Sequence, residues 1–550
     1  MNKTILAGIS VLAFSASAAQ AQVSYVTQTG NGNTIAVDNV APENENDVST
    51  IIQNGTDNDA VVYQRGTDHQ SQIQQYGTSN LVVHRQYAGE RGYSESNQGA
   101  RTGASDDQTS IIRQIGADNF GVVFQDGLNN TSTINQGAAV VGGAIDARAT
   151  SNNRATVDQI GSGISSVVEQ YAASSSGFAA SDNKASVRQR ASGGNLATQQ
   201  QSSIVQEARG NFAEVFQFEG GSAAPITSAI TQRNTSAVSN DLASNTASVA
   251  QRGLGNQSSV VQDGQQNTAY VTMLQGASAS GSTNGNSITI DQIGRGLTAL
   301  TVAGGSQNRM EARQSGINNT ALIWQMYDSS NNNIVLNQGR GAATQAVNGS
   351  PATPMATATA YATITQNGAL NSASVAQDGI SLQATVEQFG FGLADVEGAT
   401  GTAGTFKNLV TIEQTGSDQF ARAFQAASVS ASGGSGDNAA GPASGAGYAY
   451  GFAGGRRSAE IAILQSNSGN RAVVEQYGRG QVARIEQSGT GGNASIFQNA
   501  DATNATAVIQ QLGTNNSYVV QQSVAGAYIH VRQTGNGNEA TTVIPATVAP

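Results

Sequence analysis

One short repeat runs through most of this chain and constrains its fold more than any other feature. Its least interrupted copies occupy residues 47–86, where glutamine returns every eleven residues and glycine follows most of these glutamines two residues later. Asparagine, or histidine in one copy, comes three residues after each glycine, and small or apolar residues then occupy alternate positions. The unit is N-x-A-x-V-x-Q-x-G-x-x. Because a fixed short period is the signature of stacked repeats, we expect a repeat architecture instead of several globular domains.

The spacing inside the unit predicts a β-strand followed by a turn. Side chains at alternate positions lie on one face of an extended strand, whereas a helix would distribute them around its axis. The other four residues contain glycine and often Asp, Asn, Ser or Thr, which suits a tight turn. Two units would form one rung of 22 residues, and stacked rungs would bury Ala, Val and Ile between two sheets. We therefore predict an all-β fold, a two-sheeted parallel β-solenoid with loop insertions.

The inward row of each predicted strand carries glutamine and asparagine at its two ends. Each amide would meet its own copy one rung away, at ~4.8 Å, and could form the continuous hydrogen-bonded ladders of cross-β assemblies. Such ladders satisfy polar groups that would otherwise be buried without partners. The predicted ladder residues are Gln53, Asn58, Gln64, Gln75, Asn80, Gln86, Gln114, Asn119, Gln125, Gln366, Asn371, Gln377, Gln465, Asn470, Gln476, Gln487, Gln498, Gln511, Asn516, Gln522 and Gln533. The predicted core residues are Ile51, Ala60, Val62, Ile73, Val82, Ile112, Val123, Val375, Val386, Val474, Ile485, Ile496, Val520 and Val531.

No pattern in the sequence points to catalysis, a metal or a cofactor. The three histidines are His69, which replaces a ladder asparagine, His84, which lies on the inward row, and His530, which alternates outward. The segment Asp57-Asn58-Asp59 resembles a calcium site at first sight, but Asn58 belongs to the ladder. The glycine-rich nonapeptide of calcium-binding β-rolls is absent. We therefore expect these aspartates to be solvated turn charges, and we predict no enzyme.

The chain organisation follows from the repeat and from its interruptions. Residues 1–21 have the features of an export signal, with a positive start, an apolar stretch and the small-x-small site Ala19-Gln20-Ala21. The stretch is short for a membrane anchor. We expect an N-terminal repeat and linker at 22–46, solenoid with inserted loops at 47–425, a Gly/Ala/Ser-rich loop at 426–457, C-terminal rungs at 458–544 and a tail at 545–550. The insertions are expected to replace turns, at Tyr87–Asp107, Gly137–Asn152, Tyr171–Asp182, Gly276–Gly285, Gly341–Thr359, Gly390–Lys407 and Ala426–Arg457.

Composition limits the partners. The net charge of −11 disfavours a nucleic acid held through its phosphates. The absence of cysteine means that no disulfide stabilises an exported chain. Several aromatic residues directly precede a ladder glutamine and should point outward, where they either pack against neighbouring loops or form an adhesive surface for fibre bundling or matrix polysaccharide. These are Tyr63, Phe124, Phe216, Trp324, Phe424 and Phe497.

Written over two units, the repeat is S-x-I-x-Q-x-G-x-x-N-x-A-x-V-x-Q, which Ser49-Ile51-Gln53-Gly55-Asn58-Ala60-Val62-Gln64 matches at every marked position. This pattern resembles the curlin repeat of curli subunits, and the resemblance covers most of residues 23–544. It implies a bacterial protein of the Gram-negative type that forms extracellular amyloid fibres in biofilms. It also implies passage through an outer-membrane secretion pore, and partners that are other copies of the chain, other curli-type subunits or a nucleator.

The repeat and the resemblance together predict a secreted structural subunit that assembles end to end into curli-like fibres for adhesion and biofilm. Templated strand addition would act at the open sheet edges of the first and last rungs. One alternative is a monomeric solenoid adhesin that binds a surface or glycan through its loops. A β-helical polysaccharide enzyme is disfavoured, because no carboxylate cluster recurs on one face.

Overall fold

The computed structural model of the chain divides into two compact units, residues 1–269 and 270–550. All regular secondary structure in the described residues is β-strand. The residues described are 23–39, 47–90, 92–98, 107–137, 139–141, 144–146, 150–171, 182–192, 200–207, 210–220, 225–233, 244–253, 255–274, 285–304, 307–325, 332–338, 360–369, 371–391, 408–427, 459–477, 481–499, 502 and 504–545.

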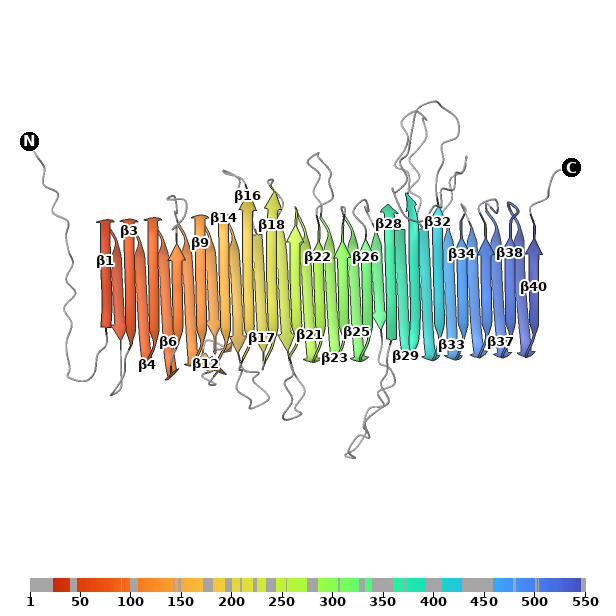
Figure 1. Cartoon of the computed structure of the whole chain (residues 1–550), viewed down its shortest axis with the longest axis horizontal. Helices are drawn as coiled ribbons and strands as arrows, with labels where there is room; N and C mark the ends of the chain where they lie inside the picture. Colours follow the sequence, from red (N-terminus) through yellow and green to blue (C-terminus); the bar gives the residue numbers. More distant parts are fainter. Residues whose placement is uncertain are drawn as a thin grey trace, which may run out of the picture. The chain divides into compact units, whose positions relative to one another are not determined.

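Unit 1 consists of two parallel sheets, and the chain alternates between them at successive turns (Figure 1). The β1 sheet contains, in spatial order, β1 (Val23–Asn31), β3 (Val48–Thr56), β5 (Gln70–Thr78), β7 (Tyr93–Gln98), β9 (Phe120–Leu128), β14 (Arg154–Ser162), β16 (Lys184–Ser192), β18 (Phe212–Gly220) and β20 (Thr246–Arg252). The β2 sheet contains β2 (Thr34–Asn39), β4 (Asp59–Thr67), β6 (Leu81–Glu90), β8 (Thr109–Ala117), β10 (Thr131–Gln136), β15 (Ser165–Tyr171), β17 (Gln200–Glu207), β19 (Ile226–Arg233) and β21 (Gln257–Gln265).

Unit 2 has the same construction. Its β24 sheet contains β24 (Thr298–Ala303), β26 (Thr320–Gln325), β28 (Ala360–Ala369), β30 (Leu382–Phe391), β32 (Phe420–Ala427), β34 (Arg471–Gln476), β36 (Asn493–Gln498), β38 (Ser517–Gln522) and β40 (Glu539–Ile544). Its β23 sheet contains β23 (Ser287–Arg295), β25 (Arg309–Ile317), β27 (Asn333–Gln338), β29 (Asn371–Ile380), β31 (Asn408–Ser417), β33 (Glu460–Ser468), β35 (Val482–Thr490), β37 (Thr506–Thr514) and β39 (Tyr528–Asn536). Strand β22 (Thr268–Met273) spans the boundary between the units.

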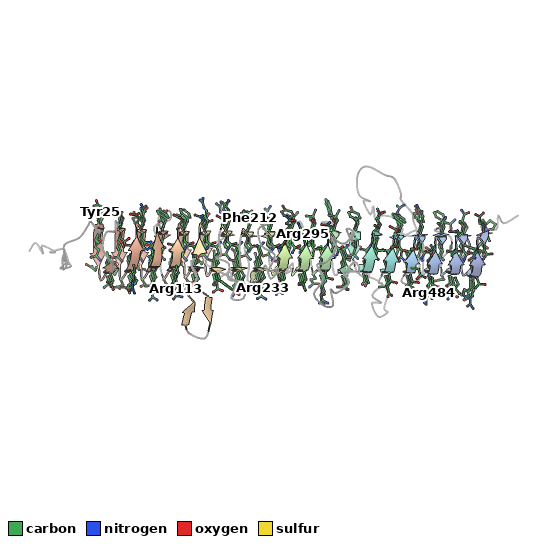
Figure 2. All side chains as sticks on the ribbon, turned by 90° about the horizontal axis from the view of Figure 1, so that it is seen from below. Tyr25, Arg113, Phe212, Arg233, Arg295 and Arg484 are labelled. Carbon is green, nitrogen blue, oxygen red and sulfur yellow. The ribbon has the colours of Figure 1, made fainter. Side chains whose placement is uncertain are left out.

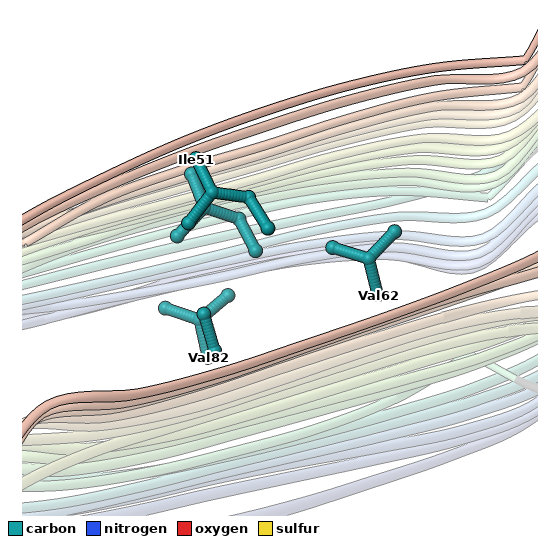
Figure 3. Packing of buried hydrophobic residues seen from close by; sticks show 5 residues of the cluster. Ile51, Val62 and Val82 are labelled. Carbon is teal, nitrogen blue, oxygen red and sulfur yellow. The ribbon is translucent and has the colours of Figure 1, made fainter. Parts of the chain in front are cut away.

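The core of each unit is a thin apolar layer between its two sheets. Burial alternates along the strands, so that in β3 Ser49, Ile51 and Gln53 are buried and their neighbours are only partly so. Figure 3 shows Ile51 of one sheet facing Val62 and Val82 of the other. Each buried Val or Ile contributes roughly 1.5–3 kcal/mol, and the layer repeats this at every rung. The prediction of a two-sheeted parallel β-solenoid is confirmed.

The turns require residues that tolerate left-handed backbone. The residue before the ladder asparagine is repeatedly Asp, Asn or Gly, as at Asp57 with φ 55° and Asn515 with φ 54°. Gly55 has φ 144°, and a Cβ added there would collide with the carbonyl oxygen of Gly77 on the neighbouring rung. The close approach of stacked turns explains why glycine returns with the repeat.

The prediction of an insertion at Tyr87–Asp107 is wrong for most of the residues that the structure describes in this range. Strand β6 continues to Glu90, and β7 (Tyr93–Gln98) is a full member of the β1 sheet between β5 and β9. The repeat is hidden there because Ser94 and Ser96 occupy the inward positions of Ala and Val, and Gly92 replaces the ladder asparagine.

Other expected segments fall largely outside the described residues. These are the export signal at 1–21, the linker residues 40–46, most of the Gly/Ala/Ser-rich loop at 426–457, the tail beyond Pro545, and the central parts of the other insertions. Within the insertion at Gly137–Asn152, the structure describes a short antiparallel pair, β11 (Ala139–Val141) and β12 (Ala144–Asp146), followed by β13 (Thr150–Ser151).

Candidate functional site

The repeated working element of the fold is a column of glutamine side chains inside each sheet. In the β1 sheet, Gln53 Nε2 donates to Gln75 Oε1 at 2.8 Å, and Gln75 Nε2 donates to Gln98 Oε1 at 3.1 Å. The same Nε2 of Gln75 also donates to the carbonyl oxygen of Asn80 at 2.9 Å and to that of Asp59 at 3.0 Å. Each amide therefore joins consecutive rungs and also ties its own strand to the opposite sheet and turn.

The glutamine ladders are directional. In the β23 sheet, Gln465 Nε2 donates to Gln487 Oε1 and Gln487 Nε2 donates to Gln511 Oε1, both at 2.8 Å. The same direction, from the earlier strand to the later one, holds for the glutamine pairs of both units. Aligned amides polarise one another, so the bonds of a column strengthen cooperatively.

The asparagines form a second ladder at the turns. Asn58 Oδ1 accepts the backbone N–H of Asn80 at 3.1 Å, and Asn80 Nδ2 donates to the carbonyl oxygen of Tyr76 within its own turn at 3.0 Å. Both side chains are buried. The amide thus holds its own turn and the next one together.

The structure places the predicted ladder and core residues in these columns. The predicted ladder residues are buried, except that the side chain of Asn371 lies outside the described residues. The predicted core residues are also buried, except that Val531 on β39 is half-buried. Strand β39 has a partner within unit 2 on one side only, β37, which accounts for the exposure of Val531.

A polar cluster interrupts the apolar core around His84. The His84 side chain is fully buried on β6, with Nδ1 2.8 Å from Ser71 Oγ and 3.0 Å from Ser94 Oγ. Its Nε2 lies 2.7 Å from Ser96 Oγ, which is in turn 2.8 Å from Ser110 Oγ. The burial lowers the pKa of His84 to about 3. The serines of β7 that hide the repeat in the sequence are therefore the partners of the unusual inward histidine.

Two residues replace asparagine in the turn ladder of the β1 sheet. Asp47 Oδ1 accepts the backbone N–H of His69 at 3.0 Å, and His69 Nδ1 accepts the backbone N–H of Gly92 at 3.1 Å. The bond to Gly92 assigns the proton of neutral His69 to Nε2. Burial lowers the pKa of His69 and raises that of Asp47. Among the described residues, Asp47 Oδ2 and His69 Nε2 are buried without hydrogen-bond partners.

We expect Asp47→Asn to stabilise the chain at pH 7 by about 1–3 kcal/mol, because it replaces a buried carboxylate, one oxygen of which has no partner among the described residues, by an uncharged amide. The raised pKa means that the native state keeps the proton longer than the unfolded state, so Asp47 lowers stability as pH rises above 3.8. Urea unfolding at pH 4 and pH 7 checks this: the gain should be larger at pH 7. Asp57→Asn, the same change at an exposed turn position, is the control.

The glutamine ladder of the β24 sheet begins at β26, because β24 has no glutamine at the ladder position. Ala303 on β24 stands in register with Gln325 on β26. Gln325 Nε2 donates to Gln366 Oε1 at 3.1 Å, while Gln325 Oε1 is buried without a hydrogen-bond partner among the described residues. Met273 on β22 and Ala303 both occupy the glutamine position of their strands, and both are buried. The sequence repeat conceals these two strands because its most regular residue is missing from them.

The outward aromatic residues lie on the solvent faces of the sheets. Trp324 is 46% exposed and Phe497 is 38% exposed. Phe424 and Phe497 both contact Tyr477, with ring centroids 5.3 Å and 5.5 Å apart. Neighbouring rungs thus partly cover these rings and leave their outer edges in water.

The described residues contain no group of three or more His, Cys, Asp or Glu side chains arranged to hold a metal ion. In the same part of the chain, no helix has the length and apolar character needed to cross a membrane. The columns of amides and small apolar side chains are suited to holding rungs together and to templating the next rung.

Comparison with known proteins supports this structural interpretation. The family model described as the curlin associated repeat matches residues 360–390, which include β28, β29 and most of β30. No curated protein matches the chain. The matched repeat and the solenoid fold are structural, not enzymatic, and they indicate an extracellular or cell-surface protein. The match lies within the repeat that runs through both units, and it is consistent with a member of the curlin-repeat family.

Proposed function

We propose that the chain is a secreted subunit of curli-like amyloid fibres that support cell adhesion and a biofilm matrix. Copies would add end to end, with β40 of one chain pairing with β1 of the next. The partners are other copies of the chain, other curli-type subunits or a nucleator, and the route is an outer-membrane secretion pore of a Gram-negative-type bacterium.

The observation that supports assembly is the open state of the terminal strands. Among the described residues, β1 pairs within unit 1 with β3 alone, and β40 pairs within unit 2 with β38 alone. Val26, on the inward row of β1, is 49% exposed although its register partner Ile51 is fully buried. An unpaired parallel edge with an exposed apolar row is a template for another chain.

Both terminal strands also present free backbone groups. The N–H of Val23 donates to Asp47 on the β3 side, so the N–H groups of the alternate residues Ser24 and Val26 face away from β3. On β40, the carbonyl of Ile544 accepts from Ser523 on the β38 side, so the N–H of Val543 faces the open edge. Val543 is 53% exposed and points away from the core.

Val543→Pro tests the proposal, because proline removes the edge N–H without altering the inward row. We expect the purified wild-type chain to form thioflavin-positive fibres visible by electron microscopy, and Val543→Pro to elongate at least tenfold more slowly. Added at a small molar fraction, Val543→Pro should also slow fibre growth of the wild type. The variant can add to a fibre end through its β1, but its β40 then cannot accept the next chain.

Val543→Ala is the matched control and should assemble like the wild type, because it keeps the N–H. Equal rates for the two variants would exclude β40 as the growing edge. A wild-type chain that stays monomeric for days would contradict fibre assembly and favour the monomeric surface adhesin.

A further inference from the structure

One outer face of unit 1 concentrates positive charge in a chain whose net charge is −11. The outward positions of β14, β16 and β20 in the β1 sheet carry Arg154, Lys184, Arg188, Arg190 and Arg252, which we call the cationic face. Arg154 of β14 is in register with Lys184 of β16, and Arg190 of β16 and Arg252 of β20 are both in register with Phe218 of the strand between them. Figure 2 shows Phe212 of this face on the opposite side of the unit from Arg113 and Arg233.

The cations of this face are accessible. Arg154, Lys184 and Arg252 are exposed, and the Arg188 and Arg190 side chains are 55% and 43% exposed.

Acidic groups do not neutralise the face. At the described outward positions of β14, β16, β18 and β20 they are limited to Asp158 and Glu214. Asp158 lies 3.6 Å from Arg188 and 3.9 Å from Arg190, so one carboxylate is shared by two guanidinium groups. The face therefore keeps a net positive charge and free guanidinium N–H groups.

Aromatic side chains border the cations: Phe120 and Phe218 each have a guanidinium group over the ring, and Phe212 on β18 is 37% exposed. Phe120 on β9 lies between Tyr93, stacked at 5.0 Å, and the Arg154 guanidinium, 4.6 Å from the ring centroid. The Arg252 guanidinium lies 5.5 Å from the ring centroid of Phe218. Binding of single-stranded nucleic acid depends on bases stacking on open aromatic faces. The groups that cover Phe120 and Phe218 occupy ring faces that stacking bases would need, which favours a partner recognised by its charge.

The spacing of the cations along the strands indicates which class of anion the face can bind. Arg154 and Lys184 lie on neighbouring strands, ~4.8 Å apart along the stack, and Arg190 and Arg252 lie two strands apart, so the cations are spread over several rungs. Guanidinium groups pair with planar carboxylates through two parallel hydrogen bonds. A linear polymer with carboxylates along its length can engage several rows at once, and many weak contacts then add up.

We propose that the cationic face binds acidic polysaccharide, a chain of uronate sugars whose carboxylates pair with Arg154, Arg188, Arg190 and Lys184. The binding goes beyond fibre assembly and does not require it, because the face lies on the side of the stack and not at its ends. In a matrix it would tie the protein to an anionic glycan laid along the rungs.

The test uses freshly purified full-length chain and polygalacturonate, measured by titration calorimetry at two salt concentrations. Arg188→Ser with Arg190→Ser should weaken binding about tenfold or more, since it removes two guanidinium groups that can pair with carboxylates. Arg484→Ser with Arg532→Ser is the control, because it removes the same charge from exposed positions in unit 2. Neutral dextran should not bind.

Absence of polygalacturonate binding, or an equal loss in the two double variants, would overturn the proposal. Tighter binding of single-stranded DNA than of polygalacturonate, lost in the Arg188/Arg190 variant, would reassign the face to nucleic acid. Fibre growth of the Arg188/Arg190 variant should equal that of the wild type, so failure of glycan binding and failure of assembly are distinguishable.

Discussion

Replacing Gln75 by alanine is expected to lower the local stability of the N-terminal rungs by about 2–5 kcal/mol. The change removes the acceptor of Gln53 Nε2 and the donor to Gln98 Oε1, and both partners are fully buried. It also removes the bonds from Gln75 Nε2 to the Asp59 and Asn80 carbonyls. Buried amides that lose their partners cannot turn to water, so the full cost of desolvation is incurred.

Gln74→Ala provides a control one residue away. Gln74 is on the outward face of the same strand, and its replacement should change stability by no more than about 0.5 kcal/mol. Hydrogen exchange of the β3, β5 and β7 amides, with urea unfolding of both variants, measures the difference. Equal effects of the two substitutions would show that the amide columns contribute nothing beyond an ordinary surface glutamine.

Acidification is expected to weaken the rungs around His84 by about 5 kcal/mol between pH 6.5 and pH 3, at 1.36 kcal/mol per pH unit. The pKa of His84 is lowered to about 3 in the folded chain, so the unfolded state binds the proton first as pH falls through 6.5. The contribution of neutral His84 to the free energy of unfolding is therefore fully present above pH 6.5, decreases as pH falls below 6.5, and stops decreasing near pH 3. The serine hydroxyls that face His84 from β5 and β7, and Ser110 of β8 that bonds to Ser96, carry no charge that could offset the imidazolium.

The pH dependence is measured as the difference between wild type and His84→Val, because other groups titrate in the same range. Valine restores the apolar column formed by Val62 and Ile112 on the flanking strands. The variant should lack the extra loss of stability on acidification, whatever its absolute stability. Identical pH profiles for wild type and variant would mean that His84 is hydrated or charged in the folded chain.

The sequence predicted the architecture because its pattern matches the physical period of the fold. Alternation at two residues fixes the inward face of each strand, and the eleven-residue return of glutamine fixes the register between rungs. Gln53, Gln75 and Gln98 stand in register in β3, β5 and β7, and the column joins them directly. The direction of the amide bonds along the column could not be read from the sequence, because both directions use the same residues.

The strands that depart from the repeat share one physical cause. β7 has Ser94 and Ser96 in the core, and β22 and β24 have Met273 and Ala303 in place of glutamine. Each strand is held by backbone ladders to its neighbours, which depend on no particular side chain. A strand can therefore lose the marks of the repeat and keep its place. The altered side chains change the contacts of neighbouring residues: serines of β7 become the partners of His84, and Gln325 Oε1 has no hydrogen-bond partner among the described residues.

Mass per unit length of assembled fibres, measured by scanning transmission electron microscopy, tests most directly whether chains assemble as stacked solenoids. Each rung holds about 22 residues per ~4.8 Å of fibre, since Gln53 and Gln75 of adjacent strands are 22 residues apart. Stacked solenoids predict one chain spread over many rungs in each protofilament. A fibre in which every chain contributes one ~4.8 Å layer would be on the order of twenty-fold heavier per unit length, and that value would contradict end-to-end assembly of the folded chain.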